Sequence, residues 1–272
     1  MKFKFALVNG ERIEAQPGLR GTCAFCQSDT IAKCGPERIW HWAHKSKASC
    51  DLCWENQTKW HMAWKNYFPG EWQESIHIDS TTKEKHIADI KTDKGFVIEF
   101  QYSAIKPSEI QSREAFYKNM VWVVNGSRLK RDYPRFCKGA RNFMYTRKRE
   151  FFLLNFPERS FPAGWLTSSV PVYFDFQGTT PLDQSDEMHA PLWCLFPGRV
   201  DGYAIVAMVS RKQFREFSLT APNLLLAQDS LSYIAPFIAW DIQHQSAIVA
   251  QRVPLPAPNR QYINAGCRRY MR

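Results

Sequence analysis

Residues 86–103, HIADIKTDKGFVIEFQYS, constrain the fold of this chain most strongly. Their apolar residues predict two strands, 86–91 and 96–102, joined by a turn over Thr92–Gly95. The apolar character of both strands predicts that the hairpin is buried. Polar side chains nevertheless interrupt both strands, and a buried polar group needs a partner.

Asp89, Glu99 and Gln101 are the polar residues of this hairpin. Side chains alternate between the two faces of a strand, so Glu99 and Gln101 share one face. Antiparallel pairing would place Asp89 across from Glu99, and two converging carboxylates are suitable ligands for Mg²⁺ or Mn²⁺. Glu55, on an upstream helix, could supply a third oxygen. The alternative is a group of exposed charges on an edge strand.

Cysteines are concentrated near the start of the chain, where five of the eight lie between Cys23 and Cys53. A chain of 272 residues can bury a core without disulfides, so this clustering favours a metal site. The candidate ligand sets are Cys23, Cys26, Cys50 and Cys53, or Cys23, Cys26, His44 and Cys50, with His41 as a further alternate. Four protein ligands make a closed, structural zinc site. The alternative is a group of reduced cysteines without a metal.

The net charge of +10 is unevenly distributed. Residues 127–150 contain 9 basic and 2 acidic side chains, and residues 252–272 contain 5 basic and no acidic ones. Short basic segments that also contain aromatic residues are typical of polyanion binding, although a solvated face and a loose tail would have the same composition. The predicted nucleic-acid contacts are Arg128, Lys130, Arg131, Arg147, Lys148 and Arg149.

The remaining pattern predicts an α/β (α+β) fold in three parts. Residues 1–53 form a hairpin and a zinc-binding segment, residues 54–150 form a core with a basic extension, and residues 151–272 form a β-rich part. The further predicted elements are a hairpin over 3–17, helices over 54–67, 108–120 and 211–217, and strands over 71–78 and 121–125. The sequence predicts no membrane span and no signal peptide, so a cytoplasmic protein is expected.

The run CAFC…HWAH…C…WENQTKWHMAWKNYF…HIAD…VIEFQYSAIKPSEIQSREAFYKNMVWVVN resembles the competence protein CoiA-like family over residues 5–126. That family belongs to the PD-(D/E)XK nuclease superfamily, so the resemblance implies a restriction-endonuclease-like core. It also implies that Asp89, Glu99 and the backbone carbonyl of Phe100 bind catalytic Mg²⁺ or Mn²⁺. In the structural zinc site, the resemblance favours His44 over Cys53.

The resemblance extends to four further positions of the predicted core. His61 and Lys65 match polar positions on its first helix, and Arg113 and Tyr117 match an Arg…Tyr pair on its second helix. Gln101 stands where most superfamily nucleases have a lysine, and Lys65 or His61 could supply the missing function from the helix.

The function expected from these residues is metal-dependent hydrolysis of DNA, single-stranded DNA included, in DNA processing, recombination or mobile-element conflict. Recombination or competence proteins are candidate partners. The alternatives are an inactive, zinc-stabilised module that binds nucleic acid and a structural adaptor that docks other recombination proteins through residues beyond 150.

Overall fold

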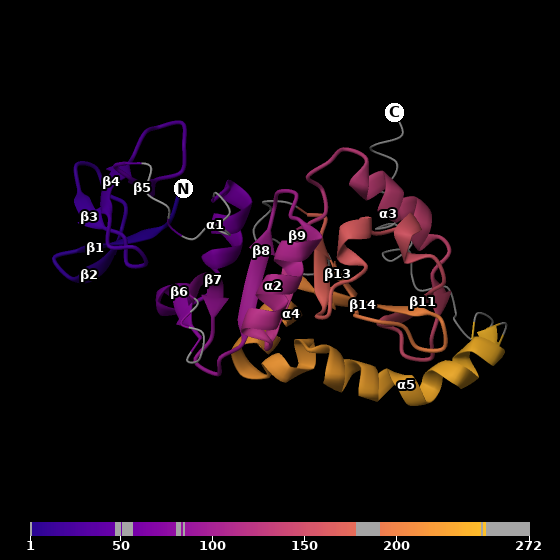
Figure 1. Ribbon diagram of the computed structural model, residues 1–272. Coiled ribbons are helices and arrows are strands. Elements are labelled where there is room, and N and C mark those ends of the chain that lie inside the picture. The colour runs from indigo at the N-terminus through magenta and orange to yellow at the C-terminus, as the bar shows by residue number, and fades with distance from the viewer. Residues whose placement is uncertain are drawn as a thin grey trace. The chain divides into compact units, whose positions relative to one another are not determined.

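The computed structural model describes residues 2–46, 50, 57–79, 83, 85–177, 191–245 and 247–248. Within this described part, sheets and five α-helices form a mixed α/β protein (Figure 1). The chain divides into two compact units, Met1–Ser103 and Ala104–Arg272. The three-part division at residues 53 and 150 stays a prediction.

The first unit begins with a five-stranded antiparallel sheet in the order β2-β1-β3-β4-β5. Its strands are β1 (Phe5–Val8), β2 (Glu11–Glu14), β3 (Arg20–Thr22), β4 (Asp29–Lys33) and β5 (His41–His44). Asn9 and Gly10 connect β1 to β2 with positive φ angles of 51° and 85°, and the antiparallel pairing of the two strands confirms the hairpin predicted over 3–17. The core of this sheet consists of Phe3, Ala6, Ala15, Cys23 and Trp42.

The first unit continues with α1 (Lys59–Lys65), η1 (Gly70–Trp72), β6 (Gln73–Ile78), β7 (Lys85–Lys91) and β8 (Val97–Gln101). The three strands are antiparallel in the order β8-β7-β6, so the hairpin predicted from residues 86–103 is confirmed. Helix α1 packs on β8 through Trp60 and Trp64, whose rings lie 6.0 and 5.6 Å from that of Phe100. These aromatic contacts fix α1 against β8.

Helix α1 is shorter than predicted: the sequence pattern placed a helix over 54–67, whereas α1 begins at Lys59 and ends at Lys65. Thr58 is the N-cap: its hydroxyl accepts a hydrogen bond from the backbone N–H of His61, and the His61 ring accepts one from the N–H of Thr58. This reciprocal capping box starts the helix at Lys59. Residues 51–56, which include Glu55 and Cys53, lie outside the described part of the chain.

The second unit contains a six-stranded sheet in the order β10-β11-β14-β13-β12-β9, in which β9 and β12 are parallel and the other pairs are antiparallel. Its elements in chain order are α2 (Pro107–Tyr117), β9 (Met120–Asn125), α3 (Asp132–Ala140), β10 (Met144–Tyr145), β11 (Phe151–Leu154), η2 (Pro157–Arg159), η3 (Ala163–Trp165), β12 (Val172–Asp175), β13 (Pro191–Leu195), β14 (Ala204–Ser210), α4 (Arg211–Thr220), η4 (Pro222–Leu225) and α5 (Ala227–Gln243).

Two predictions for the second unit need correction. Helix α2 ends at Tyr117 and not near Met120, because Lys118 has a positive φ of 59° that a helix cannot continue. The part beyond residue 150 is also less β-rich than predicted, because it contains the 17-residue helix α5. Pro236 lies inside α5, and an internal proline ordinarily argues against a helix.

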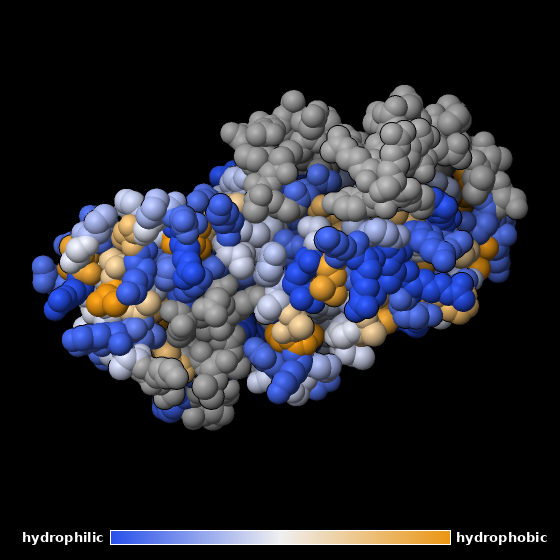
Figure 2. Space-filling model, turned by 90° about the horizontal axis from the view of Figure 1, so that it is seen from above, coloured by the Kyte–Doolittle hydropathy of each residue, from blue (hydrophilic) through white to orange (hydrophobic). Residues whose placement is uncertain are grey.

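The surface is mostly polar where it can be seen. Figure 2 shows one face of the molecule, on which hydrophilic residues predominate and hydrophobic residues form small separate patches. Among the helices that the structure describes, none has the combination of length and apolar composition that a membrane crossing needs.

Candidate metal centre and active site

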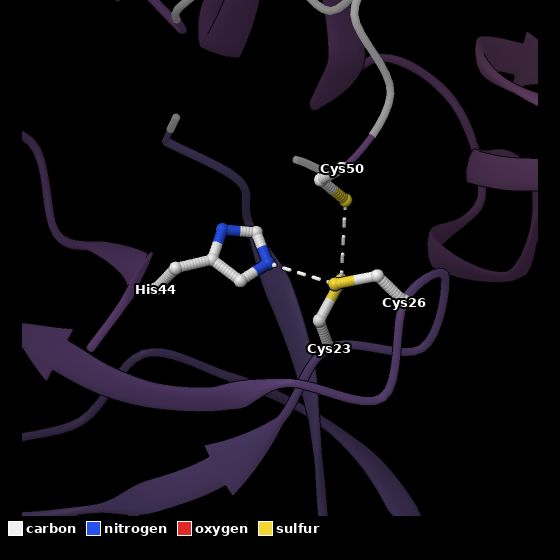
Figure 3. Close-up of side chains that lie close together, drawn as sticks. All are labelled: Cys23, Cys26, His44 and Cys50. Carbon is white, nitrogen blue, oxygen red and sulfur yellow. Dashed lines mark hydrogen bonds between the residues drawn. The ribbon is translucent and has the colours of Figure 1, made fainter. Parts of the chain in front are cut away.

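Four metal-ligating side chains meet at the edge of the five-stranded sheet (Figure 3). Cys23 and Cys26 lie in the turn after β3, His44 ends β5, and Cys50 follows it in the chain. The sulfurs of Cys23 and Cys50 are 3.7 Å apart, and the sulfur of Cys26 lies 3.2 Å from Nε2 of His44. All four ligand atoms lie within 4.8 Å of one another. This cluster can hold a metal such as zinc.

The donor chemistry of the cluster fits zinc. Two thiolates bound tetrahedrally at a Zn–S distance of about 2.3 Å lie about 3.8 Å apart, close to the separation of Cys23 and Cys50. Burial lowers the pKa of His44, which favours the neutral imidazole that binds metals. Burial raises the pKa of the Cys23 thiol, so zinc binding would have to displace that proton.

The structure describes only one of the two alternate zinc ligands, His41 and Cys53. His41 lies on β5, but its Nδ1 is hydrogen bonded at 2.8 Å to the carbonyl of Ile39, and the residue is not among the four that converge. Cys53 is not described, so the four-cysteine alternative stays a prediction.

Three buried carboxylates lie on the three neighbouring strands of the second sheet of the first unit. Glu74 and Asp89 lie between the paired residues Gln73–Ile90 and Ser75–Ala88 of β6 and β7, and Glu99 follows Ile98, which pairs with Ile90. Glu74 and Asp89 are 8% exposed and Glu99 is 1% exposed. Three buried carboxylates this close require cations or hydrogen-bond donors to compensate their charge.

Lys65 supplies part of that compensation from α1. Its ammonium lies 2.7 Å from Oδ1 of Asp89 and 3.3 Å from Oε1 of Glu74, and the side chain is fully buried. Burial lowers the pKa of a lysine, but the carboxylates of Asp89 and Glu74 outweigh burial and hold the pKa of Lys65 above its ordinary value. Burial likewise raises the pKa of a carboxyl group, but Lys65 and His61 hold the pKa of Asp89 below its ordinary value. The pair is therefore ionised at neutral pH.

The second carboxylate oxygen of Asp89 and the carbonyl of Phe100 are also engaged. Oδ2 of Asp89 accepts the backbone N–H of Phe100 at 3.0 Å. Nδ1 of His61 accepts the N–H of Thr58, so Nε2 carries the proton and donates it to the carbonyl of Phe100 at 3.1 Å. His61 thus connects the start of α1 to β8, and a catalytic role for it stays a prediction.

Gln101 lies at the end of β8 and is 4% exposed. Its amide nitrogen donates to the carbonyl of Ser103 at 3.1 Å. This hydrogen bond to the backbone fixes the orientation of the Gln101 amide.

Glu74 is the residue of this centre that the sequence pattern does not reveal. It lies in a predicted strand that also contains Glu71, and nothing in the spacing distinguishes the two. Lys65 offers an indirect signal. A lysine on the buried face of a helix needs carboxylate partners, and Glu74 is a partner of Lys65 in addition to Asp89.

Arg113 and Tyr117 lie one turn apart on the buried face of α2, as predicted. Arg113 contacts Glu109 at 3.5 Å, and its guanidinium lies 5.9 Å from the ring centre of Trp122. These contacts lie within the second unit, and a role of the two residues in the carboxylate centre stays a prediction.

The six predicted nucleic-acid contacts differ in their surroundings. Arg128, Lys130 and Arg131 are exposed in the loop before α3, and Arg149 is exposed shortly before β11. Arg147 and Lys148, in contrast, are engaged by α5. Nε of Arg147 lies 2.7 Å from Oδ1 of Asp241, its guanidinium stacks at 4.1 Å on Trp240, and the ammonium of Lys148 lies 4.5 Å from the ring centre of Tyr233.

Two family models match the chain. The model of the competence protein CoiA N-terminal domain matches residues 18–52, and the model of the CoiA nuclease-like domain matches residues 77–169. These two stretches of the chain are similar to the two domains of the CoiA-like competence protein family. The resemblance of the sequence to this family is thereby confirmed. No curated protein and no solved structure matches the chain.

The two CoiA matches cover different parts of the sites. The CoiA N-terminal match contains all four residues of the metal cluster, and the nuclease-like match contains Asp89, Glu99 and Gln101. Lys65 and Glu74 precede the nuclease-like match, so only the geometry links them to Asp89.

Proposed function

We propose that this CoiA-like chain is a nuclease of the PD-(D/E)XK type that hydrolyses DNA with Mg²⁺ or Mn²⁺. The observation that carries the proposal is the contact of Lys65 with Asp89, beside Glu99 on the next strand. The order of α1, β6, β7, β8, α2 and β9 along the chain, one helix, three strands, a helix and a strand, supports the same superfamily.

Asp89, Glu99 and the carbonyl of Phe100 are the residues that would hold the divalent ion. All three offer oxygen atoms, and hard cations such as Mg²⁺ and Mn²⁺ prefer oxygen. When bound, the ion would supply Lewis acidity to the phosphodiester and make water a stronger nucleophile. Glu55 stays a predicted further ligand, and it lies outside the described residues.

Lys65 takes over the role that a strand lysine has in most of the superfamily. Its ammonium reaches Asp89 from α1, so position 101 needs no cation of its own. A buried ammonium beside the reacting phosphate offsets the negative charge that develops in the transition state. Gln101 would hold the attacking water by hydrogen bonding, since a neutral amide can orient water but cannot remove its proton at neutral pH.

The proposed substrate is DNA because of the exposed basic loop before α3. Arg128, Lys130 and Arg131 lie on this loop, whereas α5 engages Arg147 and Lys148. Exposed cations on a short loop suit the phosphate backbone, which attracts proteins without regard to sequence.

The inactive binding module is the second candidate, and the same centre offers an observation in its favour. Both oxygens of Asp89 and the carbonyl of Phe100 already accept hydrogen bonds from Lys65, the Phe100 N–H and His61. Asp89 and the Phe100 carbonyl therefore have hydrogen-bond partners without a divalent ion. Turnover therefore decides between the two functions.

The test is to incubate the purified protein with supercoiled plasmid and with short single strands in Mg²⁺, Mn²⁺ or chelator. A nuclease cleaves at least one substrate with a divalent ion and none with chelator. Binding of either substrate without cleavage in any ion would establish the binding module.

A further inference from the structure

Glu74 joins two parts of the first unit that are far apart in the sequence. Its carboxylate accepts the backbone N–H of Lys4 through both oxygens, at 2.9 and 3.0 Å, and the N–H of Phe5 at 3.3 Å. Oε1 also contacts the ammonium of Lys65 at 3.3 Å. One buried carboxylate therefore bridges the first strand of the five-stranded sheet and the lysine of the proposed catalytic centre.

The backbone of Glu74 is strained in a way that suits this bridge. Its φ is +49°, an uncommon conformation for a residue other than glycine, at the second residue of β6. Strained residues of this kind persist where surrounding contacts hold them, and they occur preferentially at functional sites. The contacts with Lys4, Phe5 and Lys65 are the ones that hold Glu74.

Lys4 adds a second connection at the same place. Its ammonium donates to Oδ1 of Asn66 at 2.7 Å and to Oε1 of Gln73 at 3.0 Å. Asn66 is the C-cap of α1, directly after Lys65, and Gln73 precedes Glu74 on β6. The position of residue 4 therefore affects both the helix and the strand that hold the ion pair.

Phe3 connects residue 4 to the metal cluster. Phe3 precedes it, packs in one core with Cys23, and places its ring 5.2 Å from the ring of His44. The backbone of Phe3 also forms an isolated bridge with Trp42 of β5. A bound metal that fixes Cys23 and His44 would therefore fix Phe3, and with it the N–H groups that Glu74 accepts.

We infer that Glu74 is a positioning residue that makes the place of Lys65 depend on the metal cluster. It holds the ammonium of Lys65 against Asp89 only while the five-stranded sheet presents the N–H groups of Lys4 and Phe5. Loss of the metal therefore releases Lys65, which is not itself one of the cluster residues. The inference rests on the proposed nuclease for its catalytic meaning, but the coupling itself concerns structure.

The experiment measures acylation of Lys65 by a water-soluble amine reagent, read by mass spectrometry, with exposed Lys59 on the same helix as the internal reference. Four states are compared: wild type and Glu74→Gln, each with zinc and with zinc removed by a chelator. Glu71→Gln, which changes an exposed carboxylate three residues away, is the matched control. Circular dichroism checks that each variant keeps its fold.

In the wild type, zinc removal should raise the labelling of Lys65 relative to Lys59 by roughly tenfold or more, the effect of losing a hydrogen bond to a charged group. In Glu74→Gln, the labelling of Lys65 should already be as high with zinc present as it is in the zinc-free wild type. Zinc removal should then raise the labelling of this variant little further. Glu71→Gln should behave as the wild type.

Two outcomes would overturn the inference. One is unchanged labelling of wild-type Lys65 after zinc removal, which needs no variant and so holds even if Glu74→Gln does not fold. The other is a full further increase on zinc removal in Glu74→Gln, because the metal would then act on Lys65 by another route. Labelling requires no cleavage of DNA, so failure of the nuclease proposal leaves this result interpretable.

Discussion

The ammonium of Lys65 lies 2.7 Å from Oδ1 of Asp89, with the lysine fully buried and the aspartate nearly so. The lysine comes from α1, whereas position 101, two residues after Glu99, is a glutamine. In the nuclease that we propose, Lys65 would supply the cation that most PD-(D/E)XK nucleases carry at the position of Gln101.

Moving the lysine from position 65 to position 101 tests whether Lys65 supplies the cation of the proposed catalytic centre. Lys65→Met should reduce cleavage strongly, because it removes the ammonium and retains most of the apolar stem. Gln101→Lys should impair the otherwise unaltered protein, since two ammonium groups would compete for one centre, yet it should restore part of the activity in Lys65→Met. Cleavage rates of the two single variants and the double variant check this, and a double variant no better than Lys65→Met would refute the exchange.

The same ion pair should be visible in the stability of the protein. Lys65→Met leaves Asp89 and Glu74 without their shared cation, and breaking a buried pair in this way costs about 3–5 kcal/mol. Urea unfolding at neutral pH measures the loss. Lys59→Met, which replaces an exposed lysine on the same helix, should change the free energy of unfolding little.

The pH dependence of that difference has a definite sign. The pKa of Asp89 is lowered from 3.8, so its stabilisation is present above that pH and is lost as the pH falls through the lower, folded-state value. The pKa of Lys65 is raised from 10.5, so its stabilisation is present below that pH and is lost as the pH rises through the higher value. The free-energy difference between wild type and Lys65→Met should therefore be largest near neutral pH and shrink in acid. A difference that grows in acid would contradict the assignment.

Zinc content tests the Cys/His cluster. Protein purified without added zinc should contain about one zinc per chain, and Cys23→Ser and His44→Ala should lose it and destabilise the five-stranded sheet. Cys34→Ser should retain the metal, because Cys34 packs against the core of the same sheet but lies outside the cluster. Retention of zinc by Cys53→Ser supports the set with His44. Loss of zinc in Cys53→Ser together with retention in His44→Ala would establish the four-cysteine set instead.

The two groups of basic residues should respond differently to substitution. Replacement of Arg128, Lys130 and Arg131 by alanine should weaken DNA binding and reduce the slope of log K against log salt by about 0.9 for each phosphate that the variant no longer neutralises. Replacement of Arg147 and Lys148 should mainly lower stability, because they pack on α5 and Arg147 pairs with Asp241. Binding isotherms at several salt concentrations and thermal unfolding separate the effects. A triple variant at Lys118, Lys138 and Lys212, all exposed, controls for net charge.

Local patterns predicted the hairpin and the metal cluster well. The two strands and the turn after Thr92 lie within one short segment, so their pairing depends on neighbouring residues alone. In the CxxC segment, the two-residue spacing by itself brings both sulfurs within reach of one ion. His44 was identifiable as a ligand through the resemblance to the CoiA-like family, and the cluster confirms its place.

Contacts between distant residues were not predictable in the same way. Glu74 receives its hydrogen bonds from Lys4 and Phe5, some 70 residues earlier in the chain, and no periodicity marks such a pairing. Arg147 and Asp241 are 94 residues apart in the sequence, and their contact depends on α5. The sequence pattern did not predict α5, because Pro236 lies inside it. Tertiary contact, and not local propensity, determines these features.

The most direct test of the proposed nuclease is the cleavage rate of Asp89→Asn beside that of Asp93→Asn, which changes an exposed carboxylate in the turn of the same hairpin. With Mn²⁺ or Mg²⁺, Asp89→Asn should lose cleavage by roughly 100-fold or more, while Asp93→Asn should cleave as the wild type does. DNA affinity of Asp89→Asn in chelator should be unchanged or tighter, because a negative charge near the phosphate is removed. Cleavage by Asp89→Asn at the wild-type rate, or the absence of metal-dependent cleavage in the wild type, would contradict the account.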